Sequence, residues 1–360
     1  MATPTTAISR FDLSITYNEF SLLANQRKFI GLQALPPIGV SQEAASFAKI
    51  EVESLMKEPS DTRRAPYSGY DRQGWNWTTD TYAVEEHGVE EVADDAIVER
   101  YGDIVRVEQI AVNRAVNRIL QRLEYDIATA VFNTSTWAGS TLTQDIDTAA
   151  TTNGITTSGN KWTDRANSDP LADIDYAAAY IKANCGMSPN TVIMTDIDFR
   201  NCIRSTRIEG LLKYDAIEVI QAMQAGGGRV TDVVSSAAAA LAGAFGVERV
   251  LVGQGFYNSA DENIAASFSR FWTAGRVMVC HTTNDGMSGD LDSAMPCIGR
   301  TIFSTKNGEP IPGSDDPGFG SLIFDEYREE QVRGSVFRPR NKRQVKILHA
   351  QAGFLLTGAQ

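Results

Sequence analysis

The stretch that decides the fold runs from Ile97 to Phe132 and reads IVERYGDIVRVEQIAVNRAVNRILQRLEYDIATAVF. Its apolar residues recur at spacings of three, four and seven, which predicts one long helix with a single apolar stripe. The stripe consists of Val105, Val112, Val116, Ile119, Leu123, Ile127 and Ala130. Polar residues such as Asn117 are predicted to cover the other faces, and Asp103 to cap the regular helix. A helix of about 30 to 35 residues spans about 50 Å, which favours an elongated chain that contacts copies of itself.

The segment before this helix, residues 46–92, predicts a strand, a tip and a returning strand. Phe47 and Ile50 belong to the outgoing strand, and Trp77, Thr79 and Thr81 recur with the period-two pattern of the returning one. A long two-stranded ribbon is only marginally stable alone in water, so it needs a partner surface.

The tip of this ribbon is rich in Arg, Tyr and Trp, which are residue types enriched at protein interfaces. We therefore predict that neighbouring copies of the chain contact it through Arg63, Arg64, Tyr67, Tyr70, Arg72, Trp75 and Trp77. The alternative is that Trp75 and Trp77 cover the local core of their own subunit. If the tip is the contact, Trp75→Ala or Arg64→Glu impairs assembly and leaves the subunit folded.

Bulk composition indicates a globular chain. Of its 360 residues, 42% are hydrophobic and 22% charged, enough for two ordinary domains or one elaborated domain. No apolar run approaches the roughly 18 residues that cross a bilayer, and no secretory signal is recognisable, so we expect a protein made and assembled in a cytosol. The net charge of −12 argues against a DNA-binding protein, although the wall of a DNA container needs no affinity for its contents.

Motifs for catalysis or cofactor binding are absent from the sequence. It has no Walker A motif, no G-x-S-x-G elbow and no H-E-x-x-H motif, and its histidines, His87, His281 and His349, are far apart. Its four cysteines form no C-x-x-C pair, which favours buried thiols over a zinc site or disulfides. The acidic pairs at 196/198, 290/292 and 315/316 are more typical of caps and turns than of cation sites. We expect no enzyme activity, no cofactor and no metal.

The rest of the chain predicts a mixture of helices and strands. Helices are expected at 173–184, 197–204 and 235–245, the second capped by Asp196 and the third ended by Gly246. Strands are expected at 191–195, 250–252 and 277–280, with 271–272 as further strand material. The tail, 330–356, alternates like a strand and carries a basic cluster of Arg338, Arg340, Lys342 and Arg343. Residues 1–45 predict either an arm that lies on other elements or a short element of the same core.

Several segments of the chain, in order, resemble those of a known family. They are QGW at 73–75, EEHGVE at 85–90, RLEYDIA at 122–128, KWTD at 161–164, MSPNTVIM at 187–194, FGVERVLVG at 245–253 and AGFL at 352–355. Together they resemble the tailed-bacteriophage major capsid proteins with the Hong Kong ninety-seven-type fold. Each motif alone is weak, and their order along most of the chain is what is specific.

The resemblance implies an α+β fold with four parts. These are an N-terminal arm at 1–45, an extended β-ribbon loop at 46–92, a peripheral domain at 93–184 and 326–360, and an axial domain at 185–325. The peripheral domain would contain the long helix as its spine, with the apolar stripe facing a sheet of the same subunit. The axial domain would contain a central sheet flanked by helices.

In function, the resemblance implies a structural major capsid protein. Copies of the chain would assemble in the host cytoplasm into pentamers and hexamers of an icosahedral head. The head would enclose double-stranded DNA without sequence-specific binding and without a membrane. Separate scaffold, portal and decoration proteins are the further partners that the family implies.

Two features depart from the family pattern. No long helical scaffolding segment precedes the arm, which implies a separate scaffold protein or a trimmed chain. No lysine occurs from Glu58 to Asn160, so the ribbon tip cannot form the isopeptide cross-links known in some relatives. We therefore expect no ladder of covalent oligomers on a denaturing gel.

Three alternatives stay open at this point. The first is an encapsulin-like compartment shell, which has the same fold and holds enzymes instead of DNA. The second is another oligomeric virion component, such as a tail or connector protein. The third is an enzyme of unknown type, which the missing motifs disfavour. Electron microscopy of particles, with an assay for enclosed nucleic acid, separates the first from a phage head.

Overall fold

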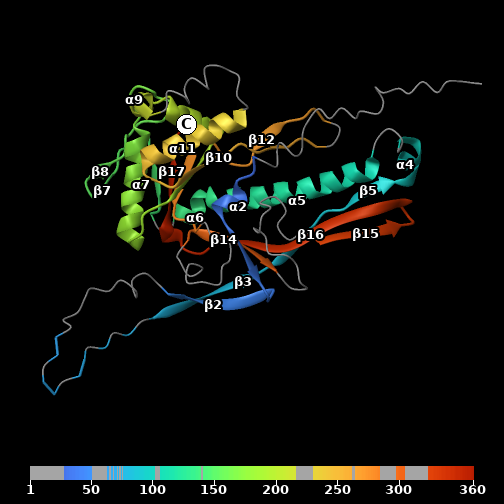
Figure 1. The fold of residues 1–360 in the computed structure, drawn as a ribbon, viewed down its shortest axis with the longest axis horizontal. Coiled ribbons are helices and arrows are strands. Elements are labelled where there is room, and N and C mark those ends of the chain that lie inside the picture. Colours follow the sequence, from blue (N-terminus) through green and yellow to red (C-terminus); the bar gives the residue numbers. More distant parts are fainter. Residues whose placement is uncertain are drawn as a thin grey trace, which may run out of the picture.

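The computed structural model describes residues 28–50, 63–64, 66–67, 69–70, 72, 74, 76–101, 106–138, 141–215, 230–261, 264–283, 297–304 and 323–360. The molecule is elongated, with most helices gathered at one end, a long helix running toward the other, and a β-ribbon projecting from the body (Figure 1). The mixed α+β class predicted from the sequence is confirmed. Among the described helices, none is long and apolar enough to cross a bilayer.

The first of two main sheets lies at the helical end. Its five strands follow the order β10 (Arg249–Gly253), β9 (Thr191–Thr195), β13 (Arg276–Cys280), β17 (Gly353–Thr357) and β6 (Thr143–Asp145). β9 is parallel to β10, and β13 is antiparallel to both β9 and β17. Every residue of β9 is buried, so other elements cover both of its faces. Among them, α7 (Pro170–Cys185) packs against β13 and β17, and α11 (Val230–Phe245) packs against β10 (Figure 1).

The second sheet has β16 (Gly334–Ile347) as its axis. The main path runs β1 (Pro37–Val40), β14 (Gly299–Ser304), β16 and β15 (Ile323–Glu329). β4 (Glu85–Gly88) and β5 (Glu91–Asp94) also pair with β16. β16 is 14 residues long, and this length allows it to pair with four other strands.

The helix predicted from Ile97 to Phe132 is two helices, so the prediction of one unbroken helix is wrong. They are α4 (Asp95–Tyr101) and α5 (Val107–Val131). Arg106 precedes α5 with a ψ of 78°, which lies outside the helical range, so α5 starts as a separate helix after it. The 25 residues of α5 span about 37 Å instead of 50. Asp103, predicted as a cap, and Val105, the first residue of the stripe, lie outside the described residues.

Four residues of the apolar stripe are buried, namely Val116, Ile119, Leu123 and Ile127, whereas Val112 and Ala130 are partly buried. The helix packs against β16 and β5 of the same subunit, as predicted. Asn117, however, is buried too, contrary to its predicted place on a polar face. It lies seven residues before the buried Glu124, and residues seven apart lie on the same side of a helix. On that side α5 packs against α2 (Gly31–Ala34), so two faces of the helix are covered and not one.

Glu124 joins three segments that are far apart in the sequence. Its Oε1 accepts hydrogen bonds from the backbone N–H of Ile30 at 3.0 Å and from the indole N–H of Trp272 at 2.6 Å. Its Oε2 accepts one from the N–H of Gly31 at 2.7 Å. A Cβ on residue 31 would lie 2.5 Å from this oxygen, so only glycine allows the close approach. Burial raises the pKa of Glu124, and the three hydrogen bonds oppose that rise.

From residue 28 onward, the N-terminal segment packs on the body of the molecule. Ile30, Ala34 and Leu35 are buried, and the Phe29 ring meets the edge of Phe271 with centroids 5.5 Å apart. The segment also forms elements of its own, α2 and the strand β1, which pairs with β14 in parallel. Both alternatives stated for residues 1–45 therefore hold in part for 28–45, and residues 1–27 lie outside the described chain.

The helices around the first sheet begin close to their predicted positions, with two corrections. α7 begins at Pro170 and not at Asp173, because the side chain of Asp169 accepts a hydrogen bond from the N–H of Ala172 and caps the helix. The cap of α8 (Asp196–Ile203) is Thr195 and not Asp196. In both cases the capping residue precedes the one that the sequence suggested.

The predicted positions of the strands, and the predicted end of α11, agree with the structure more closely. β9 has its predicted bounds, β10 includes the predicted 250–252, and Gly246 follows α11 with a φ of 65°, a left-handed conformation that ends helices. Phe271 and Trp272, however, lie in a bend between β12 (Phe268–Arg270) and β13, so their assignment to a strand is wrong. The side chain of Trp272 packs into the core at this bend, and its N–H reaches Glu124.

The strand pairings cross the domain boundaries predicted from the sequence. β17 falls within 326–360, yet it pairs with β13, which falls within 185–325. β14 falls within 185–325, yet it pairs with β16 of the tail. The chain therefore returns to the first sheet after completing the second. Pairing between strands is a long-range property, and no shift in local composition marks it.

We expect Glu124→Gln to lower the free energy of unfolding by about 1–3 kcal/mol. The amide replaces one acceptor oxygen with an N–H₂ group, which would face a backbone N–H of the arm or the indole N–H of Trp272. Urea unfolding followed by tryptophan fluorescence measures the change.

The matched control is Glu108→Gln in the first turn of α5, where the side chain is exposed. It removes the same charge from the same helix and is expected to change the stability by no more than about 0.5 kcal/mol. Equal effects of the two substitutions would contradict the role assigned to Glu124.

Candidate assembly interface: the ribbon and the strand that holds it

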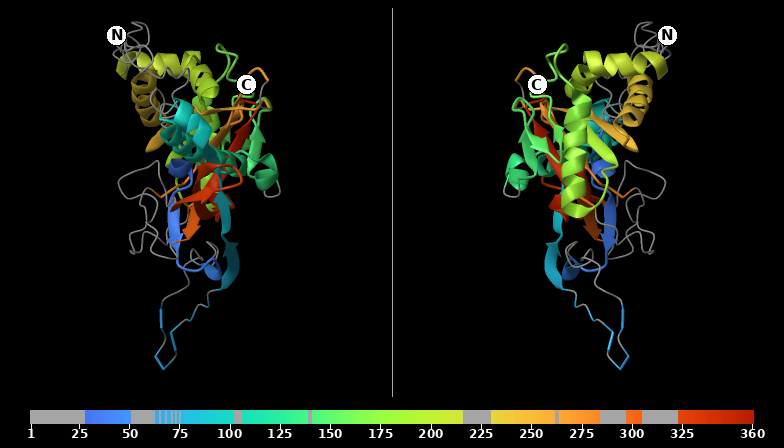
Figure 2. Two further views of the ribbon diagram at one scale, coloured as in Figure 1. Left: turned by 90° about the vertical axis from the view of Figure 1, so that its right-hand side faces the viewer. Right: turned by 90° about the vertical axis from the view of Figure 1, so that its left-hand side faces the viewer.

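The ribbon predicted from residues 46–92 is present. β2 (Ala44–Ile50) and β3 (Trp77–Ala83) are seven residues each and pair antiparallel, from Ala44 opposite Ala83 to Ile50 opposite Trp77. The strands form a sheet of their own, and the described residues between them, from Arg63 to Asn76, lie away from the body (Figure 2). None of the residues of β3 is fully buried in its own subunit.

The tip residues predicted to contact neighbouring copies are exposed wherever the structure describes them. These are Arg63, Arg64, Tyr67, Tyr70, Arg72 and Trp77. Tyr67 is fully exposed and has a φ of 68°, and the guanidinium of Arg64 lies 5.1 Å from the ring centroid of Tyr70. Trp77 is 59% exposed, so the alternative that it covers the local core is wrong. Trp75 lies outside the described residues, and the contact role of the tip remains a prediction.

The base of the ribbon is held by alternate residues of β16. Lys342 Nζ lies 2.7 Å from Glu43 Oε1, just before β2, and the N–H of Ala83 donates to Gln344 Oε1 at 2.9 Å. Lys346 Nζ donates to Asp80 Oδ1 at 2.6 Å and to the carbonyl of Thr81. Since side chains of a strand alternate between its faces, these three residues lie on one face of β16. We call this face the clamp.

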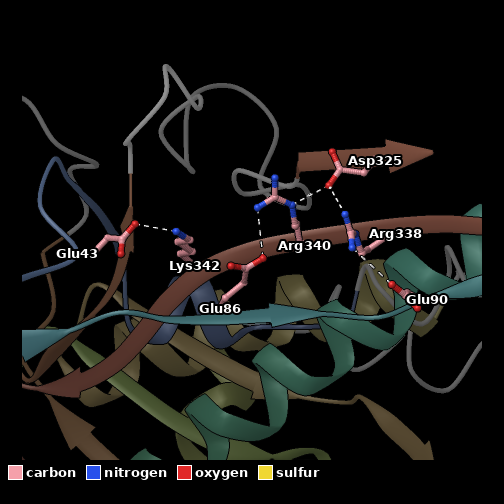
Figure 3. Close-up of polar contacts among 7 residues, drawn as sticks. All are labelled: Glu43, Glu86, Glu90, Asp325, Arg338, Arg340 and Lys342. Atoms are coloured by element: carbon pink, nitrogen blue, oxygen red, sulfur yellow. Dashed lines mark hydrogen bonds and ion pairs between the residues drawn. The ribbon is translucent and has the colours of Figure 1, made fainter. Parts of the chain in front are cut away.

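The same face of β16 continues away from the ribbon as a ladder of ion pairs (Figure 3). Arg340 lies between Asp325 of β15, at 2.8 Å, and Glu86 of β4, at 3.2 Å. Arg338 lies 3.2 Å from the same Asp325 and 3.6 Å from Glu90. The hydrogen bond from Arg340 holds the pKa of Asp325 below its ordinary value. Exposed ion pairs contribute only about 0.2–1 kcal/mol each and weaken with salt. The ladder therefore stabilises this face of the sheet because several such pairs share partners, and not through any single strong pair.

Arg343, the fourth member of the predicted basic cluster, points the other way. It is buried against α5, where its Nη2 lies 3.3 Å from Asp126 Oδ2. Burial lowers the pKa of Arg343 to about 10. β16 therefore ties the ribbon to the spine helix, because one of its faces holds the clamp and the other packs on α5.

The sequence identified the cluster of Arg338, Arg340, Lys342 and Arg343 without a role for it, and it missed Gln344 and Lys346. The signal was present, since long polar side chains occupy every second position from 338 to 346. The partners of Lys342, Gln344 and Lys346 lie some 260 to 300 positions earlier in the chain, and no local pattern connects the two regions.

The cysteines and Asp198 have structural surroundings in the described part of the chain. In the ranges given above, no three His, Cys, Asp or Glu side chains gather into a group that could hold a metal. All four cysteines are buried and unpaired, as expected, and burial raises the pKa of Cys280 to about 12, which makes it a poor nucleophile. Asp198 accepts hydrogen bonds from Thr195 and Gly275, which is a structural role. The acidic pairs at 290/292 and 315/316 lie outside the described residues.

Comparison with known proteins bears on the fold. The sequence matches no protein-family model and no curated protein. The structure is similar to a phage-related protein from Bordetella bronchiseptica, with 16% identity and a TM-score of 0.59 over 94% of this chain and 96% of that one. It is similar to the capsid structure of cyanophage P-SCSP1u, with 9% identity and a TM-score of 0.51 over 99% and 92%.

A further similarity, with 8% identity and a TM-score of 0.47 over 100% of this chain and 97% of that one, is to the SrpI encapsulin of Synechococcus elongatus. The likeness to the cyanophage capsid structure, over nearly the whole of both chains, shows that the chain has the fold of a phage capsid protein. The resemblance that the sequence motifs carried is thus confirmed at the level of the fold.

We expect Lys346→Gln to loosen the ribbon. In the native protein, the hydrogen bond from Lys346 is the main cause of the lowered pKa of Asp80, so the variant should raise that pKa toward the ordinary value of an aspartate. A carboxyl whose pKa is lowered in the folded state stabilises the fold at a pH above its unfolded-state pKa. This stabilisation is lost as the pH falls through the lower, folded-state pKa. At neutral pH, the amide hydrogens of β2 and β3 should therefore exchange about two- to fivefold faster in the variant.

Lys161→Gln is the control, because Lys161 lies far from the ribbon and its nearest acid, Asp147, is 4.0 Å away. This variant should leave exchange in β2 and β3 unchanged. Unaltered exchange in Lys346→Gln at neutral pH, or a difference that persists equally below pH 3, would count against the clamp.

Proposed function

We propose that this chain is the structural subunit of a phage head. Copies of it assemble into the pentamers and hexamers of an icosahedral shell that encloses double-stranded DNA. The observation that carries the proposal is the likeness in fold to a cyanophage capsid structure along nearly the whole of both chains. The absence of recognisable catalytic motifs from the sequence agrees with a protein that acts by assembling.

The ribbon supports the proposal on physical grounds. A two-stranded ribbon is marginal on its own, and the contacts described between this ribbon and β16 lie at its base. Tyr67, Tyr70 and Trp77 expose large aromatic surfaces, which are costly to leave in water and are typical of interface anchors. A neighbouring subunit that covers the tip would remove this cost. Many such contacts of moderate strength, repeated around a shell, give a stable particle.

The parts of the chain then take the roles that the resemblance implies. Residues 1–45 act as the arm, 46–92 as the extended loop and α5 as the spine of the peripheral domain. We assign the axial role to the first sheet and the peripheral role to the second. This assignment moves β17 and β6 out of the peripheral domain expected from the resemblance, and β14 out of the axial one. Assembly takes place in the host cytoplasm with separate scaffold, portal and decoration proteins, and the product is the virion head.

The test is to express the full chain, alone and with neighbouring phage genes, and to examine it by size-exclusion chromatography and negative-stain microscopy. Closed icosahedral particles support assembly into a shell. Particles isolated from producing cells that protect DNA from nuclease support the proposal that the shell encloses DNA. Closed shells that hold protein and no DNA would favour a compartment shell. Rings or tubes would favour a tail or connector protein, and a monomer under all conditions would refute assembly.

We expect Arg64→Glu combined with Tyr67→Ala to reduce the yield of particles at least tenfold while the subunit stays folded. The two changes reverse a charge and remove an aromatic anchor at the tip, where the subunit itself buries neither side chain. Particle yield is read by sedimentation and folding by circular dichroism.

Arg165→Glu, an equal charge reversal at an exposed site away from the ribbon, is the control and should assemble normally. If the ribbon variant assembles as well as this control, the tip is not the contact.

A further inference from the structure

One side of α5 stays outside the packing described above, and it carries arginines. Arg114, Arg118 and Arg122 follow one another at intervals of four residues, so they form a line along the helix with steps of about 6 Å. Their side chains are 53%, 47% and 62% exposed. Tyr125 is exposed on the same side, and its ring centroid lies 5.4 Å from the guanidinium of Arg122. We call these three arginines the arginine line.

The first two arginines share a single acid. Arg118 Nη1 lies 2.8 Å and Arg114 Nη2 lies 3.8 Å from the same oxygen, Oε1 of Glu91 on β5. Within the described chain, that oxygen accepts no hydrogen bond of good geometry. These are therefore charge contacts, and the N–H groups of both arginines are able to donate to a further anion.

The third arginine shares its acid with a buried residue. Arg122 Nε lies 2.9 Å from one oxygen of Asp126, and Arg343 lies 3.3 Å from the other. The three exposed guanidinium groups thus have two carboxylates beside them, and one of these two, Asp126, is shared with the buried Arg343. The other acids of α5 do not change the balance, since Glu108 lies in the first turn and Glu124 is buried on a different side.

We propose that the arginine line binds the phosphodiester backbone of the nucleic acid inside the shell, an inference that rests on the proposed function. Guanidinium groups stay charged and bind phosphate oxygens in a bidentate way. A straight row of like charges on a rigid helix fits a polymer with evenly spaced charges better than an acidic protein segment with irregular ones. The proposal requires α5 to face the interior of the shell.

The net charge of the chain explains why such contacts stay weak. At −12, most of the surface repels a polyanion, so attraction is confined to the line and is screened by salt. A weak contact that repeats in every subunit holds a long polymer near the wall without fixing its position. This agrees with a container that does not bind its contents in a sequence-specific way.

The test measures binding of the unassembled full-length chain to a labelled random-sequence DNA duplex by fluorescence anisotropy, across about 50 to 200 mM salt. The variant carries Arg114→Gln, Arg118→Gln and Arg122→Gln. It should bind at least tenfold more weakly at the lowest salt, and the slope of log K against log salt should fall by about 0.9 for each arginine lost. The triple substitution to Lys retains the charge and should retain most of the slope.

The matched control is Arg200→Gln, Arg204→Gln and Arg207→Gln, three exposed arginines of α8, its C-cap and α9 (Thr206–Asp215). It removes the same charge at the other end of the molecule and should leave the slope unchanged. Equal losses in both variants, no DNA binding by the native chain, or binding of poly-glutamate in preference to DNA would each overturn the proposal.

Electron microscopy of the same variants keeps this inference separate from the proposed function. Particles that form normally while the native chain does not bind DNA refute the arginine line alone. DNA binding that depends on the line in a chain that never forms particles refutes the shell, and leaves the phosphodiester site standing.

Discussion

The structure depends on the burial of α5 from more than one direction at once. Its apolar stripe packs on β16 and β5, and its adjacent side receives the arm and the Trp272 bend through the carboxylate of Glu124. A buried carboxylate is tolerable only when its oxygens are fully hydrogen-bonded, so the three donors cannot be separated without a large cost. Two backbone donors and one indole therefore hold the segment around Ile30 and Gly31, α5 and the bend before β13 together.

β16 transmits this rigidity to the ribbon by a different kind of interaction. Its buried face contributes Arg343 to α5, whereas its open face holds the ribbon through Lys342, Gln344 and Lys346. The contacts on the open face are individually weak and sensitive to salt, because both partners are partly in water. The body of the subunit is thus held by buried interactions, and the direction of the ribbon by exposed ones.

The fold of a phage capsid protein is reached here with 9–16% identity to solved structures. Such low sequence identity is possible because the fold requires a type of residue at each position rather than one particular residue. The required features include an apolar stripe on a helix, a strand buried on both faces such as β9, and small residues where backbones meet. Gly31 is of the last kind, since the approach of the arm to Glu124 leaves no room for a Cβ. Pairs such as Glu124 with Trp272 are specific to this packing, and no family pattern was needed to find them.

The sequence by itself determined the local elements: the helical stripe of α5, the ribbon strands, β9 and the glycine that ends α11. These follow from periodicity and backbone preference within a few residues, which is why they could be predicted. It also indicated the capsid fold, through the order of short motifs. Only the tertiary structure decided which polar residues are buried, how the tail divides between two sheets, and what the basic residues of β16 hold. Those outcomes depend on contacts between segments up to some 300 residues apart. The local sequence around a residue does not identify a partner that lies so far away in the chain.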